Sequence, residues 1–218
     1  MIRVRKSDHV PESLVAQKKY GENDVREQLK SDQDAKCYIC ERNRTTDFEV
    51  EHLQSKAKHP ELKFDWNNLS FSCSYCNGKK SDSFDLIYSP SEHDVELEIQ
   101  STVDLSEEEV HFNKMVEVDG IDTVIQLLTR IYNGTSVDGM RTFNESEFYK
   151  EFSTNIFFFI KIVSKYKRDR SNKSKQIVID ELQIDKENLG FKYHILKNIP
   201  TLFEVFKEYM VWNRQQAG

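Results

Sequence analysis

Four cysteines lie in two Cys-x2-Cys pairs, Cys37 with Cys40 and Cys73 with Cys76, and they are all the cysteines of the 218-residue chain. The pairs are 32 residues apart, and together they can supply four thiolates to one tetrahedral zinc ion. The N-terminal stretch MIRVRKSDHVPES lacks the apolar run of a secretory signal, so we expect a reducing, cytoplasmic compartment that favours metal binding over disulfides. Because protein side chains fill all four positions, the predicted zinc ion would be structural.

The residues between the cysteine pairs predict a strand–loop–strand–helix unit. The stretch FEVEH at residues 48–52 alternates apolar and polar residues as a strand does. Residues 53–67 would loop out, residues 68–72 would return as a second strand, and a helix would begin at Cys73. Zinc would then tie the chain before the first strand to the start of the helix, which compensates for the small core of so short a unit.

This stretch resembles the HNH, or ββα-metal, endonucleases of the four-cysteine, zinc-binding type. The likeness rests on Glu51-His52, then Asn68-Leu69, then CSYCNGKK at residues 73–80, in the order and spacing of that family. It extends over residues 36–85. It implies a ββα-metal module that hydrolyses phosphodiester bonds in DNA.

The resemblance implies a role for each polar residue of the motif. His52 stands at the position of the general base, where a neutral imidazole can take a proton from water near pH 7. Glu51 and Asn77 stand at metal-ligand positions, and their hard oxygen atoms suit Mg²⁺ or Mn²⁺. Asn68 stands at the position that braces the loop. The adjacent Asn67 is an alternative, but Asn68 leaves an apolar leucine in the place that follows.

The motif also contains two lysines, and it departs from the family pattern at two positions. Lys79 and Lys80 follow on the predicted helix, where either could neutralise a phosphate of the substrate. The last motif position holds Asn77 instead of the histidine found in many members, and the residue before the base is Glu51 instead of the commoner aspartate. Because neighbouring strand residues point to opposite faces, Glu51 and His52 can converge only where the strand ends or twists.

The rest of the chain predicts an α+β fold that is mainly helical. Alternation predicts short strands at residues 2–5 and 94–100, whereas residues 12–33 are expected to be helical with a break at Gly21. Apolar spacing of three to four residues predicts helices over 121–132 and 145–168, and a last one from Pro200 that bears Leu202, Val205, Phe206, Tyr209 and Trp212. We divide the chain into an N-terminal strand and helix extension at 1–35, the nuclease module at 36–90, and a mainly helical region at 91–218 with a possible partner-binding role.

The charge distribution bears on how the protein would reach DNA. Residues 1–90 carry 15 Lys/Arg and 15 Asp/Glu, whereas residues 91–218 carry 16 and 22, which accounts for the whole net charge of −6. A protein that held nucleic acid by bulk charge alone would be basic. We therefore expect a partner to supply much of the affinity. The basic run at residues 161–175 is either a solvated helix end or a contact with the DNA backbone.

A weaker likeness covers the whole chain and suggests what that partner is. The IRVRK start at residues 2–6, the early HNH module and the IYNGT stretch at residues 131–135 are similar to the nuclease subunit of Septu-type bacterial anti-phage systems. That resemblance implies an ABC-like ATPase partner and a possible homo- or hetero-oligomer. We expect no membrane span, because no stretch approaches the ~20 apolar residues that a membrane helix needs. Two alternatives remain: a non-catalytic zinc-binding adaptor for DNA or protein, and a stand-alone restriction-type HNH nuclease.

Overall fold

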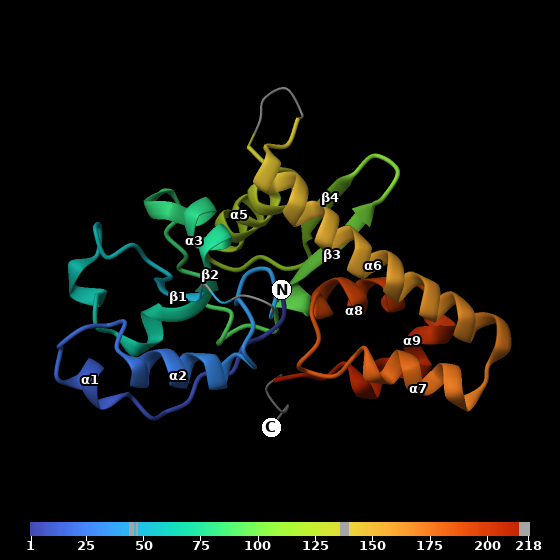
Figure 1. Ribbon diagram of the computed structural model, residues 1–218, viewed down its shortest axis with the longest axis horizontal. Helices are drawn as coiled ribbons and strands as arrows, with labels where there is room; N and C mark the ends of the chain where they lie inside the picture. The colour runs from blue at the N-terminus through green and yellow to red at the C-terminus, as the bar shows by residue number, and fades with distance from the viewer. Residues whose placement is uncertain (44–45, 47, 136–139, 214–218) are drawn as a thin grey trace.

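A computed structural model describes residues 1–43, 46, 48–135 and 140–213. Over these residues the chain is an α+β structure in which helices predominate, as the sequence predicts. Figure 1 shows one hairpin with helix α3 on one side of the molecule and helices α6 to α9 on the other. The helices are α1 (Glu12–Val15), α2 (Asn23–Asp32), α3 (Ser74–Lys80), α4 (Val95–Glu98), α5 (Ile121–Asn133), α6 (Phe143–Asp169), α7 (Asn172–Asp180), α8 (Leu189–Lys197) and α9 (Pro200–Phe206).

The predicted strand–loop–strand–helix unit is present. Strands β1 (Phe48–His52) and β2 (Leu69–Cys73) form an antiparallel hairpin, and α3 follows β2 directly. Phe48 lies opposite Cys73 and His52 lies opposite Leu69 in the register. The aromatic ring of Phe48 stacks on Phe71 of β2, with 3.9 Å between the ring centroids. Beyond the end of β1, the Leu53 amide still donates to the Asn68 carbonyl at 2.8 Å.

Helix α2 covers the hairpin, and one of its flanking residues closes the open edge of β2. Val25 and Leu29 of α2 are completely buried. Beyond the helix, the Gln33 side chain accepts a hydrogen bond from the Phe71 amide at 2.8 Å and donates one to the Phe71 carbonyl at 2.9 Å. A side-chain amide thus takes the place of a third strand, which satisfies backbone groups that an edge would leave unpaired.

The predicted strand at residues 2–5 is wrong. This segment is not assigned to a strand. The Val4 amide donates to the Pro90 carbonyl at 3.0 Å, but the Arg3 amide and carbonyl bond to the side chains of Glu96 and Asn213 instead of to a second strand. Ile2 and Arg3 are neighbours and both are buried, so the segment packs on both sides. Alternation of residue types therefore does not correspond here to one buried and one exposed face.

The predicted strand at residues 94–100 is also wrong in its placement. Val95–Glu98 form the helical turn α4, in which Val95 is 1% exposed and Leu97 is 37% exposed, so these two apolar residues do not share a buried face. The strand β3 begins only at Ile99 (Ile99–Asp104) and pairs with β4 (Glu109–Lys114). The predicted strands do not include β4, although Val110 and Phe112 alternate with polar residues along it.

The long helices agree with the apolar spacing of the sequence. Helix α5 spans Ile121–Asn133, and α6 spans Phe143–Asp169 behind a capping box made by Thr142 and Glu145. Helix α9 begins at Pro200 but ends at Phe206, so Tyr209 and Trp212 follow the helix instead of lying on it. Helices α7 and α8 are not among the helices that the sequence predicts.

One hydrophobic cluster joins all three segments into which the sequence was divided. It contains Leu29 of α2, Phe71 of β2 and Phe152 of α6. A second cluster lies among the helices after residue 158 and includes Ile2 from the start of the chain. The boundaries near residues 35 and 90 stay a prediction. None of the helices in the described ranges is long and apolar enough to cross a membrane.

Candidate active site and metal centre

The four cysteines form a closed cluster. Their Sγ atoms lie within 4.8 Å of one another, and all four side chains are buried. The Cys40 and Cys73 sulfurs are 3.8 Å apart. A regular tetrahedron with Zn–S bonds of about 2.3 Å has edges of about 3.8 Å, so the cluster fits one zinc ion. Among the described residues, no other group of three or more His, Cys, Asp or Glu side chains is gathered in this way.

The surroundings of the cluster link the module to the rest of the protein. The Arg42 guanidinium donates to the Cys73 sulfur at 3.9 Å and lies 4.9 Å from the ring centroid of Phe148 on α6. The carboxylate of Glu41 accepts hydrogen bonds from the backbone amides of Leu189 and Gly190 at the start of α8. The first cysteine pair is therefore attached both to the hairpin and to two helices of the C-terminal region.

His52 lies at the end of β1 with one ring nitrogen already engaged. Its side chain is buried, and Nε2 lies 3.0 Å from the carbonyl oxygen of Lys63 in the loop. A carbonyl oxygen can only accept, so the Nε2 atom carries the proton and the lone pair of the neutral ring is on Nδ1. Burial lowers the pKa of His52 below its ordinary value of 6.5. The Lys63 carbonyl opposes this effect, and the ammonium groups of Lys56 and Lys80 add to it.

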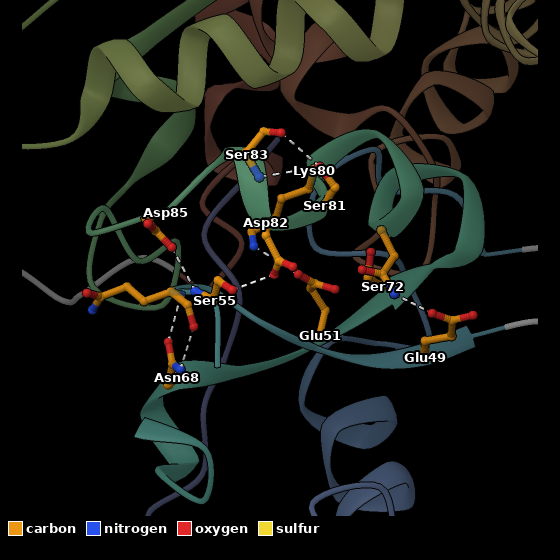
Figure 2. A network of polar contacts seen from close by, with 12 residues as sticks. Glu49, Glu51, Ser55, Asn68, Ser72, Lys80, Ser81, Asp82, Ser83 and Asp85 are labelled. Carbon is orange, nitrogen blue, oxygen red and sulfur yellow. Dashed lines mark hydrogen bonds and ion pairs between the residues drawn. The ribbon is translucent and has the colours of Figure 1, made fainter. Parts of the chain in front are cut away.

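Glu51 is held by a buried ion pair. Its Oε1 atom lies 2.9 Å from the ammonium of Lys80 on α3, and Figure 2 shows the two side chains pointing toward each other between strand and helix. Burial raises the pKa of Glu51, and Lys80 opposes the shift. Glu51 and His52, the last two residues of β1, nevertheless both line one cavity of about 350 Å³.

Asn77 reaches this cavity from α3. Its Nδ2 donates to the carboxylate of Glu49, which lies on β1 two residues before Glu51. An amide that donates through nitrogen in one direction presents its oxygen in another. The Asn77 Oδ1 atom is therefore the one left to serve as a ligand.

Asn68 holds the two ends of the loop together. Its Oδ1 accepts from the Gln54 amide at 2.8 Å, and its Nδ2 donates to the carbonyls of Gln54 at 3.0 Å and Leu62 at 3.3 Å. Figure 2 shows Asn68 at the end of the hairpin nearest the loop. The neighbouring Asn67 has an exposed side chain. Of the two adjacent asparagines, Asn68 therefore has the contacts that a loop brace requires.

Both lysines predicted to meet substrate are engaged with carboxylates. The Lys80 ammonium is buried against Glu51, and that of Lys79 contacts Glu145 at the start of α6. Burial alone would raise the pKa of Glu145, but the hydrogen bonds from Lys79 and Thr142 outweigh it and bring this pKa to about 2. A role for these lysines in binding substrate stays a prediction.

The lining of the cavity also includes Glu49, Lys56 and Tyr20, to which the sequence motif assigns no role. Glu49 had a signal, since it shares a strand face with Glu51. Lys56 lies in the loop among several lysines and carries no distinguishing pattern. Tyr20 lies upstream of α2, and its ring meets the edge of His52 with 4.6 Å between centroids. No local pattern could reveal that contact.

The basic run at residues 161–175 does not join this site. It occupies the end of α6 and the start of α7, which Figure 1 places at the opposite side of the molecule from β1 and α3. Most of its lysine and arginine side chains are exposed. A contact of this run with nucleic acid would therefore be remote from His52.

The cysteine cluster, which fits one zinc ion, lies beside a ββα unit in which an acid, a histidine and an asparagine line one cavity. The family model for HNH endonucleases matches residues 37–83, which run from the first cysteine to just beyond α3. These residues therefore form an HNH endonuclease domain. No curated protein matches the chain.

Proposed function

We propose that the protein is an HNH endonuclease that hydrolyses phosphodiester bonds in DNA with the help of Mg²⁺ or Mn²⁺. The observation that carries this proposal is the shared cavity, where Glu51 and His52 from the end of β1 meet Asn77 from α3. The three residues belong to the segment that matches the HNH family. Each has the chemical type that phosphodiester hydrolysis requires at its position.

His52 is the general base in this proposal. Its Nε2–H bond to the Lys63 carbonyl orients the ring and selects the tautomer, so Nδ1 takes the proton from the attacking water. The lowered pKa keeps the ring neutral at pH 7, which is the form that can accept a proton. Asn68 supports this arrangement indirectly, because it ties Gln54 and Leu62 together beside the carbonyl that holds His52.

Glu51 and Asn77 are the protein ligands for the catalytic cation. One carboxylate and one amide oxygen form a hard donor set, and Mg²⁺ is commonly bound by few protein ligands together with water and substrate phosphate. When bound, the cation supplies electrostatic stabilisation for the charge that builds on the phosphate and the leaving oxygen. Glu49 keeps the amide of Asn77 in the orientation that frees its oxygen. The single base implies cleavage of one strand per site.

The biological setting is a further part of this proposal. The likeness of the chain to the nuclease subunit of Septu-type systems suggests an effector of bacterial anti-phage defence that acts with an ABC-like ATPase. The acidic composition of residues 91–218 supports a division of labour in which the partner contributes much of the DNA affinity.

A cleavage assay with matched histidine variants tests the proposal. Purified protein with Mg²⁺ or Mn²⁺, with and without the product of the neighbouring gene, should nick or cut plasmid DNA, and His52→Ala should abolish this. His59→Ala is the control, since His59 lies in the same loop but lines no part of the cavity. Cleavage that is equal in wild type and His52→Ala would refute the enzyme and favour the zinc-binding adaptor.

A further inference from the structure

A tyrosine from outside the HNH segment completes the wall of the active-site cavity. Tyr20 lies between α1 and α2, whereas the family match begins at residue 37. Its ring meets His52 edge-on, at an interplanar angle of 73° and a centroid distance of 4.6 Å. Both residues line the cavity that also contains Glu51 and Asn77. The N-terminal extension thus contributes a side chain to the site itself.

Lys56 meets the same tyrosine from the loop. Its ammonium donates to the Tyr20 hydroxyl and lies 4.4 Å from the centroid of the ring. The Lys56 side chain is exposed and lines the cavity. Tyr20 therefore contacts the base on one side and a cation on the other.

The lysines near the site have different partners, and the type of partner decides which lysine can bind a phosphate. Lys79 and Lys80 are each paired with a carboxylate, and Lys80 is buried with its partner. Within the described part of the chain, no ion pair is found for Lys56, whose ammonium contacts the hydroxyl and the ring of Tyr20. Moving the Lys56 ammonium onto a phosphate oxygen uncovers no buried charge, whereas withdrawing Lys80 would leave Glu51 unpaired. Lys56 is thus the lysine of the cavity that can move onto a phosphate without breaking an ion pair seen in the described residues.

We propose that Lys56 binds a backbone phosphate of the DNA substrate beside the bond to be cleaved, and that Tyr20 is a positioning residue for both Lys56 and His52. This inference rests on the proposed nuclease function and names a substrate contact that lies outside the acid–His–Asn motif. The hydroxyl of Tyr20 holds the ammonium at the cavity, and its ring limits the rotation of the His52 imidazole. The N-terminal extension then contributes a positioning residue, Tyr20, to the active site.

A binding experiment with two lysines of one loop tests the role of Lys56. In a His52→Ala background that prevents cleavage, affinity for a labelled DNA duplex is measured by fluorescence anisotropy over a range of salt concentrations. Lys56→Met should weaken binding about tenfold and reduce the salt slope by about one, and Lys56→Arg should restore most of the affinity. Lys58→Met is the control, because Lys58 pairs with Asp85 at 2.9 Å and does not line the cavity. Equal affinities of the two Met variants would overturn the proposal.

Kinetic variants of Tyr20 separate positioning from a merely structural role. Tyr20→Phe keeps the ring against His52 but loses the hydroxyl, so KM should rise while kcat changes little. Tyr20→Leu also loses the edge contact, so kcat should fall and the pH profile of kcat should shift. Melting temperatures within a few degrees of wild type exclude misfolding as the cause. If both variants match wild type in kcat, KM and pH profile, Tyr20 has no positioning role.

The outcome for Lys56 is independent of whether the chain cleaves DNA. A protein that binds DNA through Lys56 but never cleaves it would retain this contact while the nuclease proposal fails. A protein that cleaves DNA with the same KM and affinity in wild type and Lys56→Met would retain the nuclease proposal while this inference fails.

Discussion

Replacing Lys80 by methionine should destabilise the protein strongly, because the ammonium of Lys80 is the counterion of a buried carboxylate. The Lys80 side chain is 1% exposed and that of Glu51 is 10% exposed, with 2.9 Å between Nζ and Oε1. Removing one partner of such a buried pair costs about 3–5 kcal/mol, since the other charge stays desolvated without compensation. For a chain of this size, that loss lowers the melting temperature by about 10 °C.

A double-mutant cycle shows whether the ion pair is the cause. Glu51→Gln alone should also destabilise, but the double variant Glu51→Gln/Lys80→Met should recover most of the loss because neither charge then remains unpaired. Melting is followed by circular dichroism in zinc-containing buffer without magnesium. Lys79→Met is the matched control: its partner Glu145 keeps hydrogen bonds from Thr135 and Thr142, so the loss should be smaller.

The same experiment decides between two roles for Lys80. If Lys80→Met melts like wild type but binds DNA more weakly, the lysine contacts phosphate, as the motif suggests, and the reasoning from the buried pair is refuted. If it melts at a lower temperature and the double variant recovers, the lysine supports Glu51.

Three further outcomes follow from the site. Cys73→Ser should lose zinc and unfold the module, since structural zinc contributes about 10–16 kcal/mol in small zinc domains; metal analysis and melting check this, and a folded, zinc-free variant would contradict it. The value of kcat/KM should rise with pH to a plateau, with a midpoint below 6.5. Burial lowers the pKa of His52, and only the neutral imidazole can accept a proton. A midpoint above about 7 would count against His52 as the base. Asn68→Ala removes three hydrogen bonds at about 1 kcal/mol each, so the free energy of unfolding should fall by about 3 kcal/mol, and kcat should fall with it. The control Asn67→Ala changes an exposed side chain, so it should alter stability by less than about 0.5 kcal/mol. Similar urea midpoints for the two variants would show that Asn68 does not brace the loop.

The part of the fold that the sequence predicted well is the part built from local contacts. The hairpin of β1 and β2, the start of α3 and the cysteine cluster lie within about fifty residues. The alternation at 48–52 predicts the strand correctly, but Glu51 and His52 are both buried, so β1 has no single buried face. Helices α5 and α6 were also predictable, because each has one apolar stripe that faces the core.

The failures occur where a segment is buried on more than one side or pairs with a distant one. Residues 2–5 have no strand partner, and the neighbours Ile2 and Arg3 are both buried, so the alternation of residue types does not correspond to two faces of a strand. Val95 and Leu97 look like one face of a strand but belong to a helical turn before β3. The α-helix predicted from Pro200 stops at Phe206: Tyr209 ends a 3-10 turn and is exposed, whereas Trp212 is buried and its indole donates to the Leu182 carbonyl.

The sequence by itself determined the order and spacing of the metal knuckles and of the acid, histidine and asparagine motif, because these positions are set by a short hairpin and the helix after it. Only the tertiary structure decided what each charged side chain meets. Long lysine side chains can reach several partners, and burial selects among them: Lys80 meets Glu51, Lys79 meets Glu145, and Lys56 meets Tyr20. The same folding brings Tyr20 to His52 across 32 residues of chain, a contact that no local periodicity encodes.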